Sequence, residues 1–250
     1  MIKDIKPYKQ NKMTCAIACM LMILEYNKKI EKANISDELT LYDMYHSQYM
    51  EGTPFSALAL HLGKNGLKTK LIHSEKTMFN NEKHLISEYI FEKLMTEYND
   101  YIDKGKKYGL EVENGIDISS KLLKQYLDQD TLIIIAGMHK NMFHAVLLYG
   151  YEKNNLYICD PISASKKKIS YEELYSFMNT AIGKWLLIVY NNWKGVTMDE
   201  TIIKEILKKY KITPLDIKKA DNSYNSNVYI IITSRKKYIL KIYKNKTKRL

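Results

Sequence analysis

One segment near the N-terminus constrains the fold more than any other. The stretch "CAIACMLMILEY" (residues 15–26) is apolar on nearly every side of a helix, and a helix that is hydrophobic all round is buried inside a domain. Its apolar run ends at Glu25, far short of the roughly 20 residues that a membrane-crossing helix needs. The segment therefore predicts a globular domain built around a central helix that begins at Cys15.

The predicted secondary structure changes character after Asp130. Before it, periodicity predicts amphipathic helices over 36–50, 54–66 and "ISSKLLKQYLDQD". After it, "TLIIIAGM", "FHAVLLYGY", "NLYICDP" and "KWLLIVY" are short β-branched and aromatic runs separated by turns. This order predicts the α+β class, with a helical half, an antiparallel sheet and a cleft between them as the natural place for a site.

Other segments complete the predicted domain organisation. "LKTKLIHS" alternates like a strand, and the charged stretch 75–115 reads as a helical insertion beside the site. Further on, "MDETIIKEILKKY" predicts a helix, and "NVYIIITSRKKYILKIYKN" a strand pair that turns at Thr233–Lys236. We therefore predict a domain over 1–193 and a small helix-plus-hairpin appendage over 194–250.

Charge and cysteine content limit the possible partners and cofactors. The net charge of +11 comes almost entirely from dispersed Lys; Arg, the better reader of phosphates and base edges, is scarce. This pattern argues against a nucleic-acid role and favours an acidic partner. No secretory or membrane segment is visible, so we expect a cytoplasmic protein that does not bind a membrane. Cys15 and Cys19 have no second Cys/His pair at metal-site spacing, so neither a metal nor a cofactor is predicted.

Cys15 and His144 are the candidate nucleophile and base. Cys15 lies in the first turn of its helix, with Thr14 as the expected cap, and a helix N-terminus favours the thiolate form of a cysteine. His144 differs from the other histidines because it begins a clean strand, "HAVLLYGY". His139, in the loop predicted before that strand, is the reserve base. Taken singly, a buried cysteine and a strand histidine also fit purely structural roles.

Asp160 is the candidate acceptor that orients the base. It ends the next strand, sixteen residues after His144. If the hairpin turns at Glu152–Lys153, Asp160 lies within one position of the residue opposite His144. If it turns at Asn154–Asn155, Asp160 slips by about four residues, on the order of 10 Å. The spacing therefore allows the pair but does not require it.

Two blocks of the sequence resemble one family. "QNKMTCAIACMLMILEY" and "FHAVLLYGYEKNNLYICDP" look like the catalytic helix and the histidine strand of papain-like cysteine peptidases that process double-glycine bacteriocin leaders. The resemblance covers roughly residues 5–190 and implies a papain-like fold. It implies Cys15 as nucleophile, His144 as base and later acid, and Asp160 as the group that holds the imidazole. Gln10 would donate to an oxyanion hole together with the Cys15 N–H.

The resemblance predicts a cysteine acyl-transfer enzyme that works through a thioester and cleaves a peptide or related amide. The chain departs from the family pattern at Thr14, where an acidic residue is usual, and it carries no transporter segment. One alternative is an acyltransferase of natural-product biosynthesis that moves an acyl group from a carrier-protein thioester to an amine. A second alternative is a non-catalytic peptide-binding module.

The C-terminal segment has a separate, weaker resemblance. "NVYIIITSRKKYILKIYKN" looks like the first strands of an aminoglycoside-phosphotransferase-like kinase lobe, with Lys241 at the position of the phosphate-binding lysine. Neither a catalytic loop nor a metal-binding Asp follows before Leu250. We therefore expect a docking module or a remnant here rather than kinase activity.

Overall fold

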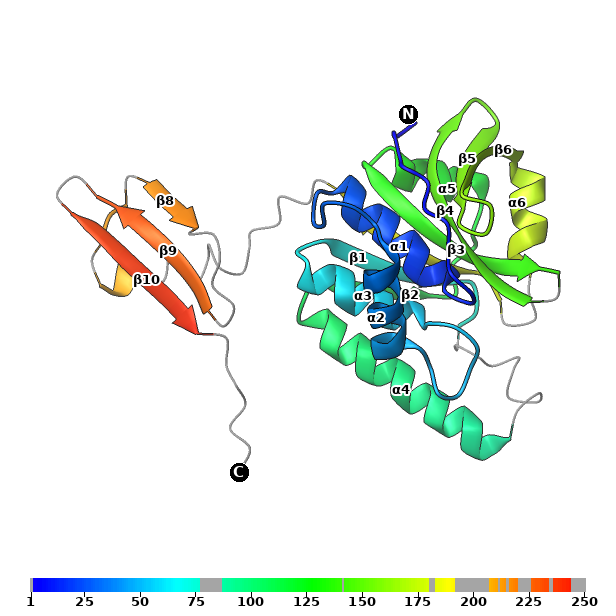
Figure 1. The fold of residues 1–250 in the computed structure, drawn as a ribbon, viewed down its shortest axis with the longest axis horizontal. Coiled ribbons are helices and arrows are strands. Elements are labelled where there is room, and N and C mark those ends of the chain that lie inside the picture. The colour runs from blue at the N-terminus through cyan, green and yellow to red at the C-terminus, as the bar shows by residue number, and fades with distance from the viewer. Residues whose placement is uncertain are drawn as a thin grey trace. The chain divides into compact units, whose positions relative to one another are not determined.

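The computed structural model describes residues 2–76, 87–140, 142–179, 183–191, 207–210, 212–214, 216–219, 226–233 and 236–243. The chain divides into two compact units, Met1–Trp193 and Lys194–Leu250, each of which is considered by itself (Figure 1).

The first unit combines helices with one large sheet. Its helices are α1 (Cys15–Tyr26), α2 (Ile35–Tyr45), α3 (Phe55–Lys64), α4 (Glu88–Lys106), α5 (Ser120–Leu127) and α6 (Tyr171–Met178). Its strands are β1 (Lys68–His73), β2 (Leu110–Asn114), β3 (Thr131–His139), β4 (Met142–Glu152), β5 (Asn155–Asp160), β6 (Ser165–Ser170) and β7 (Trp185–Tyr190).

The seven strands lie in the order β2-β1-β7-β3-β4-β5-β6. Only β1 and β2 pair in parallel; the other neighbours are antiparallel. The predicted α+β class is confirmed. Two strands from before Asp130 also join the sheet, and one of them, β2, lies inside the segment predicted as a helical insertion. That segment supplies both a helix and an edge strand.

Helices pack on both faces of the sheet. Side chains alternate across it, so that Leu147 joins one core, with α1, α3 and α4, while Leu148 joins the other, with α5 and α6. In α1 the whole run from Ala16 to Leu24 is buried. The sheet, α2 and α3 all contact α1 (Figure 1). The apolar segment therefore lies at the centre of this unit.

A buried aromatic cluster links α4 to the sheet. His73 Nδ1 lies 2.8 Å from Asn114 Oδ1, and its Nε2 lies 3.0 Å from the Tyr98 hydroxyl. The rings of His73 and Tyr98 both pack edge-on against Trp185, at 5.0 and 5.8 Å between centroids. Burial lowers the pKa of His73. Its ring is therefore neutral near pH 7 and packs edge-on against Trp185.

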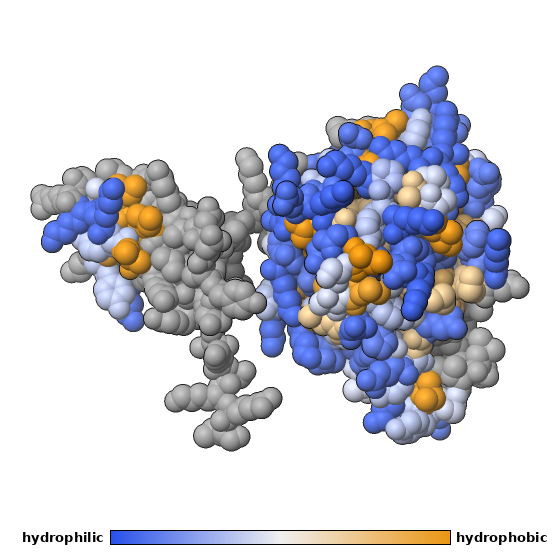
Figure 2. Space-filling view, in the orientation of Figure 1, coloured by the Kyte–Doolittle hydropathy of each residue, from blue (hydrophilic) through white to orange (hydrophobic). Residues whose placement is uncertain are grey.

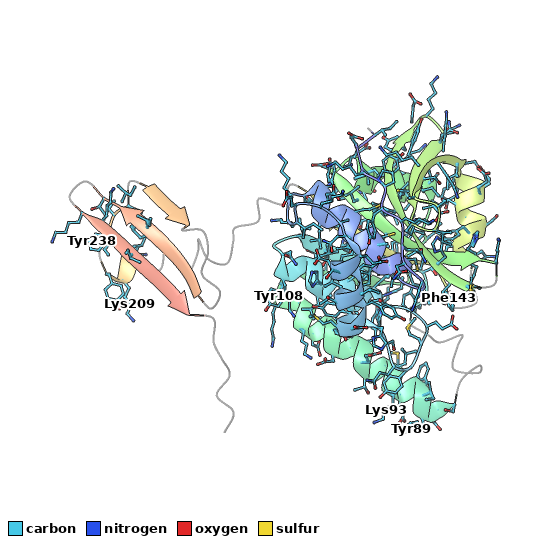
Figure 3. All side chains as sticks on the ribbon, in the orientation of Figure 1. Tyr89, Lys93, Tyr108, Phe143, Lys209 and Tyr238 are labelled. Atoms are coloured by element: carbon cyan, nitrogen blue, oxygen red, sulfur yellow. The ribbon has the colours of Figure 1, made fainter. Side chains whose placement is uncertain are left out.

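The far end of α4 is also tightly packed. A Cβ added at Gly63 of α3 would lie only 2.7 Å from the Tyr108 Cβ, at the position that Figure 3 labels. A larger residue at Gly63 would therefore push the end of α4 away from α3. The other end of α4 carries Lys93, whose Nζ lies 5.5 Å from the Tyr89 ring centroid.

The exterior of the first unit is mainly hydrophilic on the face in Figure 2, where apolar side chains form separate small patches. None of the described helices is both long and apolar enough to cross a bilayer.

The second unit contains a three-stranded antiparallel sheet in the order β10-β9-β8, with β8 at Asp216–Lys219, β9 at Ser226–Ile232 and β10 at Lys237–Tyr243. Between β9 and β10 the Thr233 N–H donates to the Lys236 carbonyl at 3.0 Å. The sequence did not predict β8. Most of the predicted helix "MDETIIKEILKKY" lies outside the described residues, as does the side chain of Lys241.

Candidate active site

Cys15 is the first residue of α1. The first intrahelical bond runs from the Ala18 N–H to the Thr14 carbonyl at 2.8 Å, so the N–H groups before Ala18 have no helical partner and point out of the helix end. Thr14 does not cap the helix with its side chain, contrary to expectation. Its hydroxyl contacts the Asn11 carbonyl and the Glu38 carboxylate instead.

A β-bulge decides which face of the sheet Asp160 occupies. Near the turn, Glu152 pairs with Asn155, but the register shifts by one residue between Leu148 and Gly150. Without that shift Asp160 would fall opposite Leu147, whose side chain points away from the His144 face. With it, Asp160 and His144 share one face.

The His144 ring is hydrogen-bonded to Asp160. The Nε2 and Oδ1 atoms are 3.0 Å apart, and both residues are buried. Asp160 also accepts from Lys167 Nζ at 2.7 Å and from the Ile162 N–H at 3.0 Å. Burial alone would raise the pKa of Asp160, but these donors outweigh it and hold that pKa well below its usual range. The carboxylate is therefore ionised whenever the protein is folded near neutral pH.

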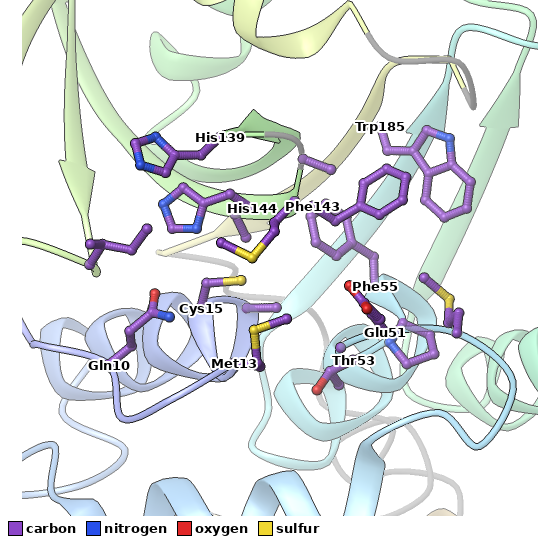
Figure 4. Close-up of a pocket in the computed structure, with 18 residues that line it drawn as sticks. Gln10, Met13, Cys15, Glu51, Thr53, Phe55, His139, Phe143, His144 and Trp185 are labelled. Atoms are coloured by element: carbon purple, nitrogen blue, oxygen red, sulfur yellow. The ribbon is translucent and has the colours of Figure 1, made fainter.

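The other nitrogen of His144 is available to Cys15. Figure 4 shows the ring directly beside the Cys15 side chain. Burial opposes a charged imidazole, yet the hydrogen bond to Asp160 and the interaction with the Cys15 side chain together raise the pKa of His144 to about 9. Because Nε2 faces Asp160, Nδ1 is the ring nitrogen that remains for an interaction with Cys15.

Phe177 of α6 fixes the ring of His144 from another side, edge-on at 6.2 Å between centroids. Gly137 lies opposite His144 on β3, and a Cβ there would lie 2.4 Å from Phe177 ring atoms. A glycine at this point therefore lets α6 approach the histidine. His139, predicted to be in a loop, ends β3 with its ring centroid 5.8 Å from that of His144.

Gln10 is held beside Cys15 by its backbone and its side chain (Figure 4). Its N–H donates to the Pro161 carbonyl at 2.9 Å, and its Nε2 donates to the Lys12 carbonyl at 2.5 Å. The Oε1 atom is buried with no hydrogen-bond partner among the described residues. One of the two Nε2 hydrogens thus remains for a further acceptor.

One cleft, whose empty space of about 810 Å³ includes open solvent, lies at this site. Gln10, Cys15, His139 and His144 lie along it (Figure 4). Most of its other lining residues are apolar, and they include Met13, Met50, Phe55, Met142, Phe143, Ile162 and Trp185. Glu51 is the carboxylate among the lining residues. The cleft therefore combines a few polar groups at one place with a long apolar wall, as ligand sites commonly do.

The other two cysteines are packed in the core. Cys19 and Cys159 are both fully buried, and burial raises the pKa of each thiol, to about 11 for Cys159. Their thiols are therefore unreactive at neutral pH.

Glu38 and Lys167 are site residues that the sequence analysis missed. Glu38 shares the buried side of α2 with Leu41 and Tyr45, and a carboxylate on an apolar helix face is a signal that could have been noticed. Lys167 lies in the run "KKK" and gave no such signal.

Comparison with known proteins gives the following matches. The sequence model of the Peptidase_C39 like family matches residues 2–193. Among solved structures, a double glycine motif protease from an AMS/PCAT transporter, in complex with the leader peptide, is 18% identical, with 76% of this chain and 94% of that chain covered and a TM-score of 0.41. The peptidase domain of Streptococcus ComA, a bi-functional ABC transporter in a quorum-sensing pathway, is 18% identical, with 74% and 98% covered and a TM-score of 0.40. No curated protein matches the sequence.

Proposed function

The chain belongs to the Peptidase_C39-like family of papain-like cysteine peptidases, and we propose that it cleaves a peptide amide through a thioester on Cys15. The family match confirms the resemblance drawn from the sequence and the prediction of an enzyme. The roles of individual residues are our proposal. The observation that carries it is the buried hydrogen bond between His144 and Asp160, with Cys15 beside the same imidazole (Figure 4).

Cleavage would begin from a thiolate–imidazolium pair, formed by transfer of the Cys15 proton to His144 Nδ1. The thiolate attacks the scissile carbonyl, and the negative charge moves to the carbonyl oxygen. The Cys15 N–H and the free hydrogen of the Gln10 amide are the donors to that oxygen, and one such donor is worth about 10²–10³ in rate in a comparable site. The imidazolium then gives its proton to the leaving amine, and a thioester remains.

The second half of the reaction releases the acyl group. His144, now neutral, takes a proton from water as the water attacks the thioester, and the Cys15 sulfur leaves. Asp160 stabilises the imidazolium at both stages without being protonated itself. Its strongly lowered pKa supports this role.

A double-glycine leader peptide is the substrate class we propose, and a short synthetic leader with residues after the two glycines tests it by mass spectrometry. The expected result is one cleavage after the second glycine, abolished by Cys15→Ala. Intact peptide with wild-type protein, together with peptide binding, would contradict cleavage and favour the non-catalytic binding module.

The apolar wall of the cleft favours a second candidate, amide formation. Met13, Met142, Phe143 and Ile162 are exposed apolar residues along the cleft; an acyl chain lying on them would keep water from the thioester. An amine would then resolve the thioester in place of water. A carrier-protein thioester incubated with the enzyme and a simple amine such as glycine amide would then give the amide in excess over the acid.

A further inference from the structure

A buried carboxylate on α2 lies behind the loop that carries the proposed oxyanion donors. Glu38 has no exposed surface. Its Oε2 accepts from the Tyr8 hydroxyl at 2.7 Å, and its Oε1 accepts from the Asn11 N–H at 2.8 Å. The Thr14 hydroxyl contacts Oε1 as well. Three donors from one loop thus converge on a single side chain of another element.

These bonds fix both ends of the turn between Gln10 and Cys15. Asn11 begins the turn and Thr14 ends it. Between them Lys12 has a φ of 58°, a conformation that a side-chain-bearing residue adopts at a cost. The surrounding bonds must therefore hold the turn in place.

This turn sets the direction of the Gln10 side-chain amide. The Lys12 carbonyl accepts one of the two Nε2 hydrogens, which leaves the second with a defined direction. A change in the turn would move that carbonyl and rotate the amide away from the cleft. It would leave the contact between His144 and Asp160 unchanged, because that pair lies on β4 and β5.

We propose that Glu38 is a positioning residue for the oxyanion hole, acting through the turn from Asn11 to Thr14; this inference rests on the proposed function. Burial and the bond to Glu38 raise the pKa of Tyr8, so the tyrosine stays a donor to the carboxylate. Glu38 itself touches no reacting atom. It sets where the Gln10 amide and the Cys15 N–H point when charge develops on the substrate oxygen.

Two reagents separate this role from a general effect on folding. Iodoacetamide alkylates the Cys15 thiolate by displacement at carbon and forms no oxyanion. p-Nitrophenyl acetate acylates the same sulfur through a tetrahedral oxyanion and releases p-nitrophenolate. The ratio of the two rate constants therefore reports the oxyanion hole, independent of how much thiolate or folded protein is present.

The test measures both rates on the full chain, for wild type, Glu38→Gln and Asp43→Asn. Asp43 is an exposed carboxylate on the same helix and serves as the matched control. We expect Glu38→Gln to lower the acylation-to-alkylation ratio by about tenfold, less than complete loss of one donor. Asp43→Asn should leave the ratio unchanged. A ratio within twofold of wild type for folded Glu38→Gln overturns the proposal.

If Glu38→Gln does not fold, a milder variant tests the same proposal. Tyr8→Phe removes one of the three donors from a half-buried site and should lower the ratio by about two- to threefold, in line with one lost hydrogen bond of roughly 0.5 kcal/mol. An unchanged ratio here also overturns the inference. Failure of the proposed function looks different, because wild-type Cys15 would then react with neither reagent faster than a free thiol.

Discussion

The two sides of the cleft each depend on one buried carboxylate that accepts three donors, but the donors differ. On the helical side, Glu38 accepts from two hydroxyls and one backbone N–H. In the described part of the chain no ion pair joins it. On the sheet side, Asp160 accepts from a backbone N–H, a lysine and the His144 ring. Glu38 therefore holds a loop in place, whereas Asp160 interacts with a lysine and a histidine that can carry charge.

We therefore expect Glu38 to act by positioning atoms, and Asp160 to act through its charge as well. Glu38 holds atoms in place through hydrogen bonds from neutral donors, so its loss should misplace those donors. Asp160 also controls how strongly His144 holds its proton, so its loss should change the pH dependence too. The following changes test that division, beginning with the largest expected effect.

Asp160→Asn should lower peptide cleavage by about 10²-fold, because proton transfer by a positioned base contributes roughly 10²–10⁴ in rate. The variant should also bring the pKa of His144 down from about 9 toward the ordinary histidine value of 6.5. An NMR titration of the His144 ring measures the second effect. An unchanged titration midpoint would mean that Asp160 acts by position alone, like Glu38, and the division would fail.

Wild-type stability should depend on pH in the matching direction. A raised pKa in the folded state means that the charged ring of His144 stabilises the fold fully below pH 6.5, and that this contribution is lost as the pH rises through about 9. Melting temperatures between pH 6 and pH 10 should therefore fall more steeply in wild type than in His144→Ala. Parallel curves would contradict the charge coupling.

Gly137→Ala should destabilise the protein by about 1–3 kcal/mol, the usual cost of overpacking. The new methyl group would collide with the ring and backbone oxygen of Phe177, so α6 must move from His144. Chemical denaturation measures the loss. In a Phe177→Ala background the cost should be smaller because the ring is removed, although the backbone oxygen of residue 177 remains; an equal cost in both backgrounds would show that the Phe177 ring is not the obstacle.

Lys167→Met should have the smallest effect. Removing a cation beside Asp160 leaves the carboxylate to the His144 ring and the Ile162 N–H, so the pKa of His144 should rise, but only slightly because Lys167 is half exposed. Cleavage near pH 7 should stay within about threefold of wild type. High salt should remove the difference between the two proteins; a difference that persists would contradict an electrostatic origin.

Much of the architecture was predictable because the signals are local. The all-round apolar segment gave α1 with both bounds correct, and the β-branched runs gave β3, β4, β5 and β7, whereas the lysine-rich β6 was not predicted. The strand β2 was missed because "LEVEN" is short, charged and surrounded by helical periodicity. Its place in the sheet comes from pairing with β1, which lies about 40 residues earlier in the chain.

The site was predictable only in part, for a physical reason. The sequence spacing allowed His144 and Asp160 to meet. Whether their side chains share a face of the sheet depends on a one-residue bulge, and no residue pattern predicted that bulge. Glu38 was read as part of an amphipathic helix because its partners, from Tyr8 to Thr14, lie 24 to 30 residues away. Contacts of this kind depend on tertiary packing, which local periodicity does not encode.

The most direct test of the account is the reactivity of Cys15. Wild type, Cys15→Ala and His144→Ala would be treated with iodoacetamide at pH 6 and followed by intact-protein mass spectrometry, with N-acetylcysteine as the free thiol. We predict labelling of wild type at one site, at least about tenfold faster than the free thiol, because a free thiol of pKa near 8.5 is almost entirely protonated there. Labelling should be absent in Cys15→Ala and slowed in His144→Ala. Labelling no faster than N-acetylcysteine, or equal in wild type and His144→Ala, would contradict the proposed thiolate–imidazolium pair.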